Sequence, residues 1–419
     1  MIKNYIKIAW RSILKNKLFS LLNIIGLSVS LCISILLLAY TNKELSFDRM
    51  YPKVEEIYRV KMKTTQEYNY QEWVTIPNAV GPAIKKDVPG VIASTRLLRD
   101  DFGSPASIMV NQQTFIESGI YLADSSIFSM FDIKFVEGNS TTVFKEKNSI
   151  VISQSKKEKL FGSKSAINEL IYINQRDTLQ ITGVFEDLPQ HSTLDCEMIY
   201  NIMDTRLGQN EYWGNASYET YLQLDNAVDP KIVENNATKL IDKYVEKEDQ
   251  YFSDFSLQPL KEVHLYSTDF RPGYTSRVGS IGLVKNLLYL AALIALIASI
   301  NYMNLATART SRQTKEIGVN KILGASKKQV STRFYIETFI ITLISIAFGF
   351  ILSLLTIPLF NAITGIEILM HELVTIQMAI ALVCCWIVIS VLAGSFPAIH
   401  GIDKIIEFNW KRSWKKYPY

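Results

Sequence analysis

The sequence predicts a membrane protein with four transmembrane α-helices and a large α+β extracytoplasmic domain inserted between helices 1 and 2. Four long runs lack charged residues, and each is long enough to cross a membrane, because about 20 helical residues span roughly 30 Å of hydrocarbon. Charge is also segregated: residues 41–282 hold 26 basic and 34 acidic residues, whereas the rest of the chain holds 18 and 6. The mean hydropathy of +0.11 therefore averages two unlike parts.

The distribution of basic residues separates a membrane partner from a nucleic-acid partner. The net charge is only +4, and the basic residues form short clusters beside apolar runs. A nucleic-acid-binding domain instead gathers basic residues on one broad face. We therefore expect contact with membrane lipid and no nucleic-acid partner.

Residues 1–18 have the pattern of a helix that lies on the membrane surface. Four basic residues follow one another at four-residue intervals, while apolar residues occupy other faces. This periodicity predicts a cytoplasmic interfacial elbow helix whose basic row faces anionic headgroups: Lys3, Lys7, Arg11 and Lys15. A plain basic flank of the first span is the alternative.

The apolar runs define the four spans. The first run is longer than the 7–15 residues of a signal-peptide core, and no small-residue cleavage site precedes Lys43, so we expect it to remain as an anchor. The transmembrane helices are expected over residues 19–40, 283–308, 334–360 and 374–399.

Basic residues in the short flanks set the orientation. Residues 1–18 hold five basic residues and no acid, and the loop 309–333 holds seven against one. The tail 400–419 holds five against two, whereas the turn 361–373 has two acids and no basic residue. Both termini and the 309–333 loop are therefore expected in the cytoplasm, and residues 41–282 and the 361–373 turn outside it.

The exported segment alternates between strand and helix periodicities, which predicts a compact α+β domain. Pro230–Val245 is strongly amphipathic, and its expected buried face consists of Ile232, Val233, Leu240, Ile241 and Tyr244. We expect other helices at 79–88, 125–131 and 154–161, and strands at 57–62, 91–98, 149–153, 170–174, 179–185, 218–224 and 255–260. Two stalks, Thr41–Glu56 and about Val263–Gly282, join the domain to the membrane.

The sequence offers little for catalysis. The four histidines lack metal-ligand spacing, and no nucleophile elbow is present. Phe161–Ser165 reads FGSKS and lacks the glycine that precedes lysine in a phosphate-binding loop. We therefore expect no catalytic residue, metal site or cofactor in this chain.

The 309–333 loop is the most informative segment. It predicts a short helix over 312–323 with Ile317, Val319, Ile322 and Leu323 partly exposed, ended by Gly324, while Ser326 caps the next helix. A helix lying on the bilayer is an alternative. Glu316 and the tight glycine turn instead favour a protein partner.

Several segments carry a family resemblance. EIGVNKILGASKKQV (316–330) resembles the cytoplasmic loop of FtsX-like, MacB-type ABC permeases, and NYMNLATART (301–310) is similar to the end of their second helix. LSFDRMYPKVEEIYRV (45–60) and ITGVFEDLP (181–189) resemble their MacB-like periplasmic core domain. The resemblance covers nearly the whole chain in the right order.

The resemblance implies a permease subunit of the bacterial inner membrane that works by mechanotransmission, in export, efflux or substrate extraction. The resemblance also implies that such subunits pair as dimers and that a separate ABC ATPase, which binds ATP and Mg, docks beneath them. An outer-membrane or periplasmic partner is also possible. The docking surface would be the coupling loop: Arg312, Lys315, Glu316, Ile317, Gly318, Val319, Lys321, Ile322, Leu323, Gly324 and Ala325.

Two departures from the family leave questions open. Many similar permeases contain two such units, so this chain homodimerises, pairs with another half, or is a truncated remnant. The 400–419 tail lacks the usual proline-containing helix. Gly26, Ser30 and Ser34 form a small-residue strip that serves either packing within the chain or a dimer seam.

Two other functions remain. A non-transporting regulator of a periplasmic enzyme or signal would need the same coupling loop. A membrane-anchored ligand sensor without an ATPase would not explain that loop, and the sequence has no cytoplasmic output domain.

Overall fold

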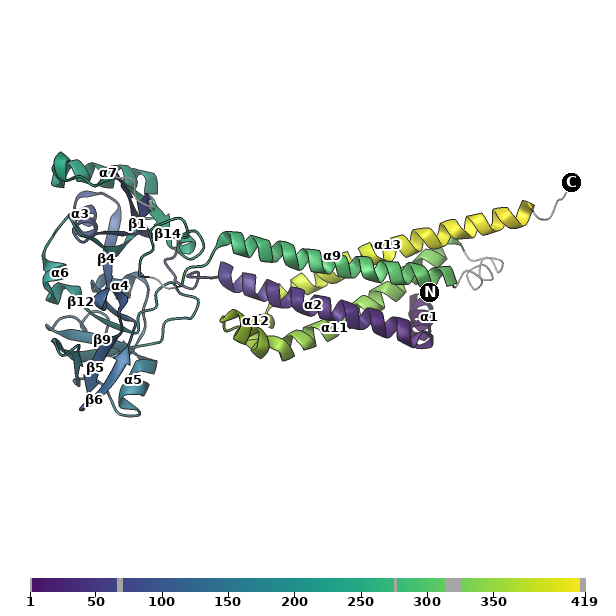
Figure 1. The fold of residues 1–419 in the computed structure, drawn as a ribbon, viewed down its shortest axis with the longest axis horizontal. Helices are drawn as coiled ribbons and strands as arrows, with labels where there is room; N and C mark the ends of the chain where they lie inside the picture. Colours follow the sequence, from purple (N-terminus) through teal and green to yellow (C-terminus); the bar gives the residue numbers. More distant parts are fainter. Residues whose placement is uncertain (1, 66–70, 275–276, 313–325, 415–419) are drawn as a thin grey trace. The chain divides into compact units, whose positions relative to one another are not determined.

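The computed structural model describes residues 2–65, 71–274, 277–312 and 326–414 of the chain (Figure 1). Its internal contacts divide the protein into two compact units. The membrane unit joins Met1–Lys43 to Gly282–Tyr419, and the outer unit is the continuous segment Glu44–Ile281. The outer unit is thus inserted between the first long helix and the later ones, as the sequence predicts.

The membrane unit is helical. Among the described residues, four of its helices are long and apolar enough to cross a membrane. They extend past the expected spans because helical hydrogen bonding continues beyond the apolar run into polar residues. The helices of this unit are α1 (Ile2–Lys15), α2 (Lys17–Leu45), α9 (Ile281–Arg312), α11 (Lys327–Thr364), α12 (Met370–Leu373) and α13 (Ile376–Trp414).

Small polar side chains join the spanning helices. Ser28 Oγ of α2 donates a hydrogen bond to the carbonyl oxygen of Ser345 in α11 at 3.0 Å, and a Cβ added at Gly349 would lie 2.9 Å from the Ser28 carbonyl oxygen. Ser34 Oγ donates to the Ala291 carbonyl oxygen in α9 at 3.1 Å. Hydrocarbon cannot satisfy these groups, so helix-to-helix bonds satisfy them instead.

At one end of the membrane unit, a lysine forms an ion pair with a glutamate. Lys43 near the end of α2 is 8% exposed, and its Nζ lies 3.3 Å from a carboxylate oxygen of Glu372. Gly365 ends α11 in the left-handed conformation, and the Asn361 side chain bonds the backbone of Ile368 at 2.9 and 3.1 Å. The 361–373 turn and the end of α2 therefore lie at the same end of this unit.

The outer unit is built on strands that pair, in its described residues, in the order β14-β1-β13-β4-β7-β12-β9-β11-β10-β5-β6, with β2, β3 and β8 beside β1, β13 and β11. The β9–β11 and β7–β12 pairs are parallel and the others antiparallel. Their bounds are β1 (Ile57–Thr64), β2 (Glu72–Trp73), β3 (Thr75–Pro77), β4 (Val91–Arg99), β5 (Ala106–Val110), β6 (Gln113–Glu117), β7 (Ile120–Ala123), β8 (Phe135–Glu137), β9 (Ser149–Ser153), β10 (Leu170–Ile173), β11 (Asp177–Phe185), β12 (Met198–Asn201), β13 (Ala216–Leu224) and β14 (Phe252–Pro259).

Short helices complete the outer unit. The strands and helices predicted from periodicity are all present, whereas β2, β3, β5 to β8, β12, α6 and α8 were not predicted. The helices are α3 (Val80–Asp87), α4 (Ser126–Met130), α5 (Gln154–Phe161), α6 (Arg206–Gln209), α7 (Pro230–Tyr244) and α8 (Leu260–Val263), with 3-10 turns η1 (Asp100–Gly103), η2 (Ile202–Asp204) and η3 (Lys247–Asp249).

The buried face of α7 differs in part from the prediction. Val233, Leu240 and Ile241 are buried as expected, together with Ala237. Ile232 is 56% exposed and Tyr244 38% exposed, so their assignment to this face was wrong. The positions i, i+4, i+7 and i+8 from Val233 keep to one side of a helix with 3.6 residues per turn, and Ile232 falls about 100° away from them.

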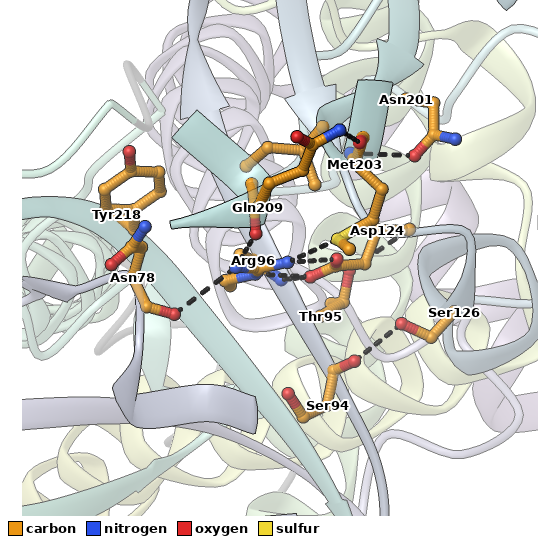
Figure 2. A network of polar contacts seen from close by, with 12 residues as sticks. Asn78, Ser94, Thr95, Arg96, Asp124, Ser126, Asn201, Met203, Gln209 and Tyr218 are labelled. Carbon is orange, nitrogen blue, oxygen red and sulfur yellow. Dashed lines mark hydrogen bonds and ion pairs between the residues drawn. The ribbon is translucent and has the colours of Figure 1, made fainter. Parts of the chain in front are cut away.

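A buried ion pair fixes the segment that contains η2 and α6 (Figure 2). Arg96 on β4 is 2% exposed and holds Asp124 with two hydrogen bonds, of 2.9 Å from Nε and 2.7 Å from Nη2. Its Nη1 donates to the carbonyl oxygens of Gly208 and Asn78. Asp124 also accepts the Arg96 backbone N–H at 2.9 Å. The guanidinium thus ties loop backbone to the sheet.

Candidate coupling site

The predicted coupling residues Lys315, Glu316, Ile317, Gly318, Val319, Lys321, Ile322, Leu323, Gly324 and Ala325 lie outside the described residues. The structure does describe both ends of the loop. Helix α9 ends at Arg312, and α11 begins at Lys327. The candidate site is therefore built from the side chains that hold these two ends.

The start of α11 carries the predicted cap. Ser326 Oγ accepts the backbone N–H of Gln329 at 3.3 Å, and the Gln329 side chain accepts the Ser326 backbone N–H at 2.8 Å. This reciprocal capping box satisfies backbone donors that the first helical turn leaves unpaired. It confirms the prediction that Ser326 caps the next helix, and it fixes the residue at which α11 begins.

An ion pair joins the two helices below the loop. Nη1 of Arg309, three residues before the end of α9, bonds the carboxylate of Glu337 on α11, and the two side chains are 12% and 8% exposed. A buried charge is costly unless a partner compensates it, so each residue requires the other. The pair holds the end of α9 against the first turns of α11.

Arg309 also contacts the first two helices. Its Nη2 donates to Ser12 Oγ on α1 at 2.5 Å, and its guanidinium carbon lies 5.0 Å from the centroid of the Phe19 ring on α2. The latter distance permits a cation–π interaction. One side chain at the base of the coupling loop therefore touches α1, α2 and α11.

A small pocket adjoins this arginine. Nε of Arg309 has no hydrogen-bond partner among the residues that the structure describes. Tyr302 closes one wall, and its hydroxyl donates to Thr338 Oγ1 at 3.1 Å. The pocket is lined by Phe19, Tyr302, Ala306, Arg309, Phe334, Glu337 and Thr338.

The elbow helix α1 is anchored on the side that carries Ser12. Ala9, Ser12 and Ile13 are buried, and Ser20 Oγ donates to the Ile13 carbonyl oxygen at 3.1 Å. The predicted basic residues Lys7, Arg11 and Lys15 are exposed, as are Ile6, Ile8, Trp10 and Leu14. The backbone of Lys3 is helical, but its side chain lies outside the description. An exposed surface that mixes basic and large apolar residues suits a membrane interface.

The predicted small-residue strip splits into two parts. Ser34 contacts α9 as described above, whereas Ser30 Oγ bonds the Gly26 carbonyl oxygen of its own helix, and nothing lies within 4 Å of a Cβ added at Gly26. Packing within the chain therefore explains only Ser34. The close approach of α2 to α11 uses Ser28 and Gly349 instead, which the sequence analysis missed.

The Arg309–Glu337 pair was not predicted from the sequence either. A signal was available, because Glu337 is the one acid in the predicted 334–360 span and Arg309 directly follows the predicted 283–308 span. Opposite charges at facing helix ends predict a pair when the connecting loop is short. The hydroxyl of Ser12 gave no comparable signal.

Comparison with known proteins places this site in context. Residues 20–240 match the MacB-like periplasmic core domain, and residues 288–402 match the FtsX-like permease C-terminal domain. An uncharacterized ABC transporter permease, YknZ of Bacillus subtilis, is 27% identical over 59% of this chain and 57% of its own length. The macrolide export ATP-binding/permease protein MacB of Pasteurella multocida is 23% identical over 68% of this chain and 41% of its own. The chain thus spans about half the length of these relatives.

Two solved structures match about half of this chain. The periplasmic region of MacB from Actinobacillus actinomycetemcomitans is 12% identical, with a TM-score of 0.37, over 50% of this chain and 90% of that structure. The extracellular domain of the noncanonic ABC-type transporter YknZ from Gram-positive bacteria is 15% identical, with a TM-score of 0.36, over 48% and 99%.

Proposed function

The chain belongs to the family of FtsX-like, MacB-type ABC transporter permeases, and on that basis we propose that it transmits ATP-driven motion from a separate cytoplasmic ATPase to its outer unit. ATP and Mg would be bound and used by that ATPase. The termini and the coupling loop would face the cytoplasm, and the outer unit the periplasm. A second permease half would complete the assembly.

The observation that supports this proposal most directly is the set of contacts made by Arg309. A loop pushed by a partner does work only if its two ends move together. The buried bond to Glu337 joins these ends, and the bond to Ser12 carries the displacement to the elbow helix. A force on the coupling loop would therefore shift α1, α9 and α11 as one body.

The composition of the apolar spans suggests where the substrate is handled. Few ionisable residues lie inside the apolar spans, although a polar path through the membrane would need them. We therefore propose that the substrate is handled at the outer unit, in export, efflux or extraction from the envelope. A periplasmic or outer-membrane partner would complete such a route.

Copurification tests the proposal. The full chain, coexpressed with an ABC ATPase subunit from the same genome that binds it, should retain that subunit through purification. Replacement of Glu316 with Ala and Ile317 with Arg should abolish retention, because it removes a charge and inserts another in the docking surface. The double variant Lys15→Ala/Lys17→Ala, on an exposed cytoplasmic flank, is the matched control. Equal retention by both double variants would refute the coupling role.

Protease accessibility tests the orientation. A protease added outside intact inner-membrane spheroplasts should cut between Thr41 and Gly282 but not between Arg309 and Arg333. Permeabilised membranes should lose this selectivity. Cleavage of the 309–333 loop in sealed spheroplasts would reverse the proposed topology.

A further inference from the structure

The outer unit contains a buried histidine that belongs to neither the sheet nor the coupling site. His264 directly follows α8, at the start of the second stalk, and Glu44 lies in the last turn of α2, at the start of the first. The two residues are 4% exposed each. Their side chains meet with His264 Nε2 3.1 Å from Glu44 Oε2.

The hydrogen bond of His264 Nδ1 determines which protonation states allow Nε2 to bond Glu44. His264 Nδ1 lies 2.8 Å from the carbonyl oxygen of Arg277, which can only accept a hydrogen bond. Nδ1 must therefore carry a proton, and Nε2 is left to face the carboxyl group. The contact then needs one more proton, either on Nε2 or on Glu44. With that proton in place, the imidazole bridges the first stalk and the later part of the second.

Packing holds the ring in this orientation. The Phe47 ring stacks on the His264 ring, with centroids 3.5 Å apart and planes 3° from parallel. The backbone of Gly279 crosses the pair, and its N–H donates to the His264 carbonyl oxygen at 2.9 Å. A Cβ added at Gly279 would lie 2.6 Å from both Glu44 Oε2 and His264 Nε2. The chain passes so close to the pair that only glycine fits without displacement.

Both stalks are also tied to the loop around Ser192. From the first stalk, Asp48 Oδ1 accepts the Thr193 N–H at 2.8 Å, and the Tyr51 hydroxyl lies 2.6 Å from Ser192 Oγ. From the second, Arg277 Nη1 donates to the Ser192 carbonyl oxygen at 3.1 Å. The stalks therefore share one support inside the outer unit.

We propose that Glu44 and His264 form a latch that makes the two stalks move as one body. The β1–β14 pairing starts at Tyr58 and Pro259. Between it and the ends of the outer unit, the described residues of both stalks contain no strand and form mainly turns, bends, short helical segments and irregular backbone. The latch stiffens that stretch. This inference rests on the proposed function, because a joint between stalks matters only if the spans move; His264 is thus a positioning residue.

Hydrogen exchange of the full chain in lipid nanodiscs, without any ATPase, tests the latch itself. His264→Phe keeps the stacked ring and loses both hydrogen bonds, so the amides of Gly279 and Ile281 should exchange at least tenfold faster. Glu44→Gln can donate its amide to Nε2 of a neutral ring, so exchange should stay within about threefold of the wild type. The double variant Glu44→Gln/His264→Phe leaves no unpaired buried carboxylate and should still show the fast exchange.

Lys261→Ala is the matched control. It breaks an ion pair with Glu55 that also joins the two stalk regions, but those side chains are 33% and 65% exposed. Such pairs contribute little, so exchange should not change. If His264→Phe and the double variant behave like Lys261→Ala, the latch does not exist.

A second measurement, on the complex with the ATPase, separates this inference from the proposed function. ATP should change exchange across the outer unit in the wild type and in Lys261→Ala, and at least fivefold less in His264→Phe. If the wild type neither binds the ATPase nor changes its hydrogen exchange with ATP, the proposed function is refuted. The exchange measured in nanodiscs without the ATPase would still show whether the latch exists. An equal ATP response in His264→Phe would show that coupling does not use the latch.

Discussion

Two arginine–carboxylate pairs, one in each unit, differ in how completely the arginine nitrogens are hydrogen-bonded. Arg96 in the outer unit gives Asp124 two hydrogen bonds and uses its other nitrogen on loop carbonyl oxygens. Arg309 in the membrane unit bonds Glu337 and Ser12 but leaves its Nε without a partner in the described part of the chain. Every described polar atom of the Arg96 side chain has a hydrogen-bond partner. Arg309 leaves its Nε unpaired within the described residues and lines a small pocket.

The difference lies in how completely each network satisfies its buried polar groups. A fully satisfied network costs much to open, because every freed group would remain buried and unpaired. It therefore suits a domain that must keep its shape. The Arg309 network leaves one donor without a partner among the described residues, so it is less completely satisfied, although it still joins α1, α9 and α11.

Loss of the Arg96–Asp124 pair should have the largest effect on the stability of the outer unit. Arg96→Met leaves Asp124, whose side chain is 18% exposed, without its cation and should destabilise the outer unit by about 3 kcal/mol. Native-state hydrogen exchange of the β4 and β13 amides measures this. Lys134→Met, at an exposed ion pair with Asp132, should leave these amides unchanged. A similarly small effect of Arg96→Met would remove the contrast between the two pairs.

Asp48 extends the comparison to a buried carboxylate whose Oδ2 has no hydrogen-bond partner among the described residues. Burial raises its pKa from 3.8 to about 6, although the Thr193 N–H opposes the shift. The folded state thus favours the protonated acid, and this contribution to stability is lost as pH rises from about 4 to 6.

Asp48→Asn removes that pH dependence. Asparagine accepts the same N–H and tolerates the left-handed backbone at this position, where φ is 59°. The variant should therefore gain stability relative to the wild type above pH 6, by at most about 3 kcal/mol, and gain nothing near pH 4. Urea unfolding of the full chain in detergent at both pH values measures the difference. A gain that is equal at both values would rule out the shifted carboxyl.

Loss of the Arg309–Glu337 pair should reduce coupling to the ATPase more than it reduces the stability of the protein. Glu337→Gln keeps the shape but removes the charge beside Arg309, at a cost of about 1–3 kcal/mol within the membrane unit. We expect the ATPase activity stimulated by the permease to fall at least fivefold, with unchanged exchange in β4 and β13. Glu367→Gln, at an exposed carboxylate of the same unit, is the control. Reduced protection in β4 would show instead that the outer unit depends on this pair.

Periodic segments were predictable because their local pattern and their burial agree. Strand β9 (Ser149–Ser153) and helix α5 (Gln154–Phe161) lie where the sequence indicates, since the Ser153 side chain caps α5 by accepting the Lys156 N–H. Strands β5, β6 and β7 were missed. β6 pairs with β5 across the two-residue turn at Asn111 and Gln112, whereas β5 and β7 also pair with the distant strands β10 and β12.

The amino-acid sequence by itself determined the four apolar helices, the inserted domain and the family, because hydrophobic length and short motifs are local properties. Tertiary structure alone decided which polar groups meet. Arg309 and Glu337 are 28 residues apart, Arg96 and Asp124 also 28, and Glu44 and His264 220. No periodicity links such residues; they become partners because burial leaves each charge no other way to be compensated.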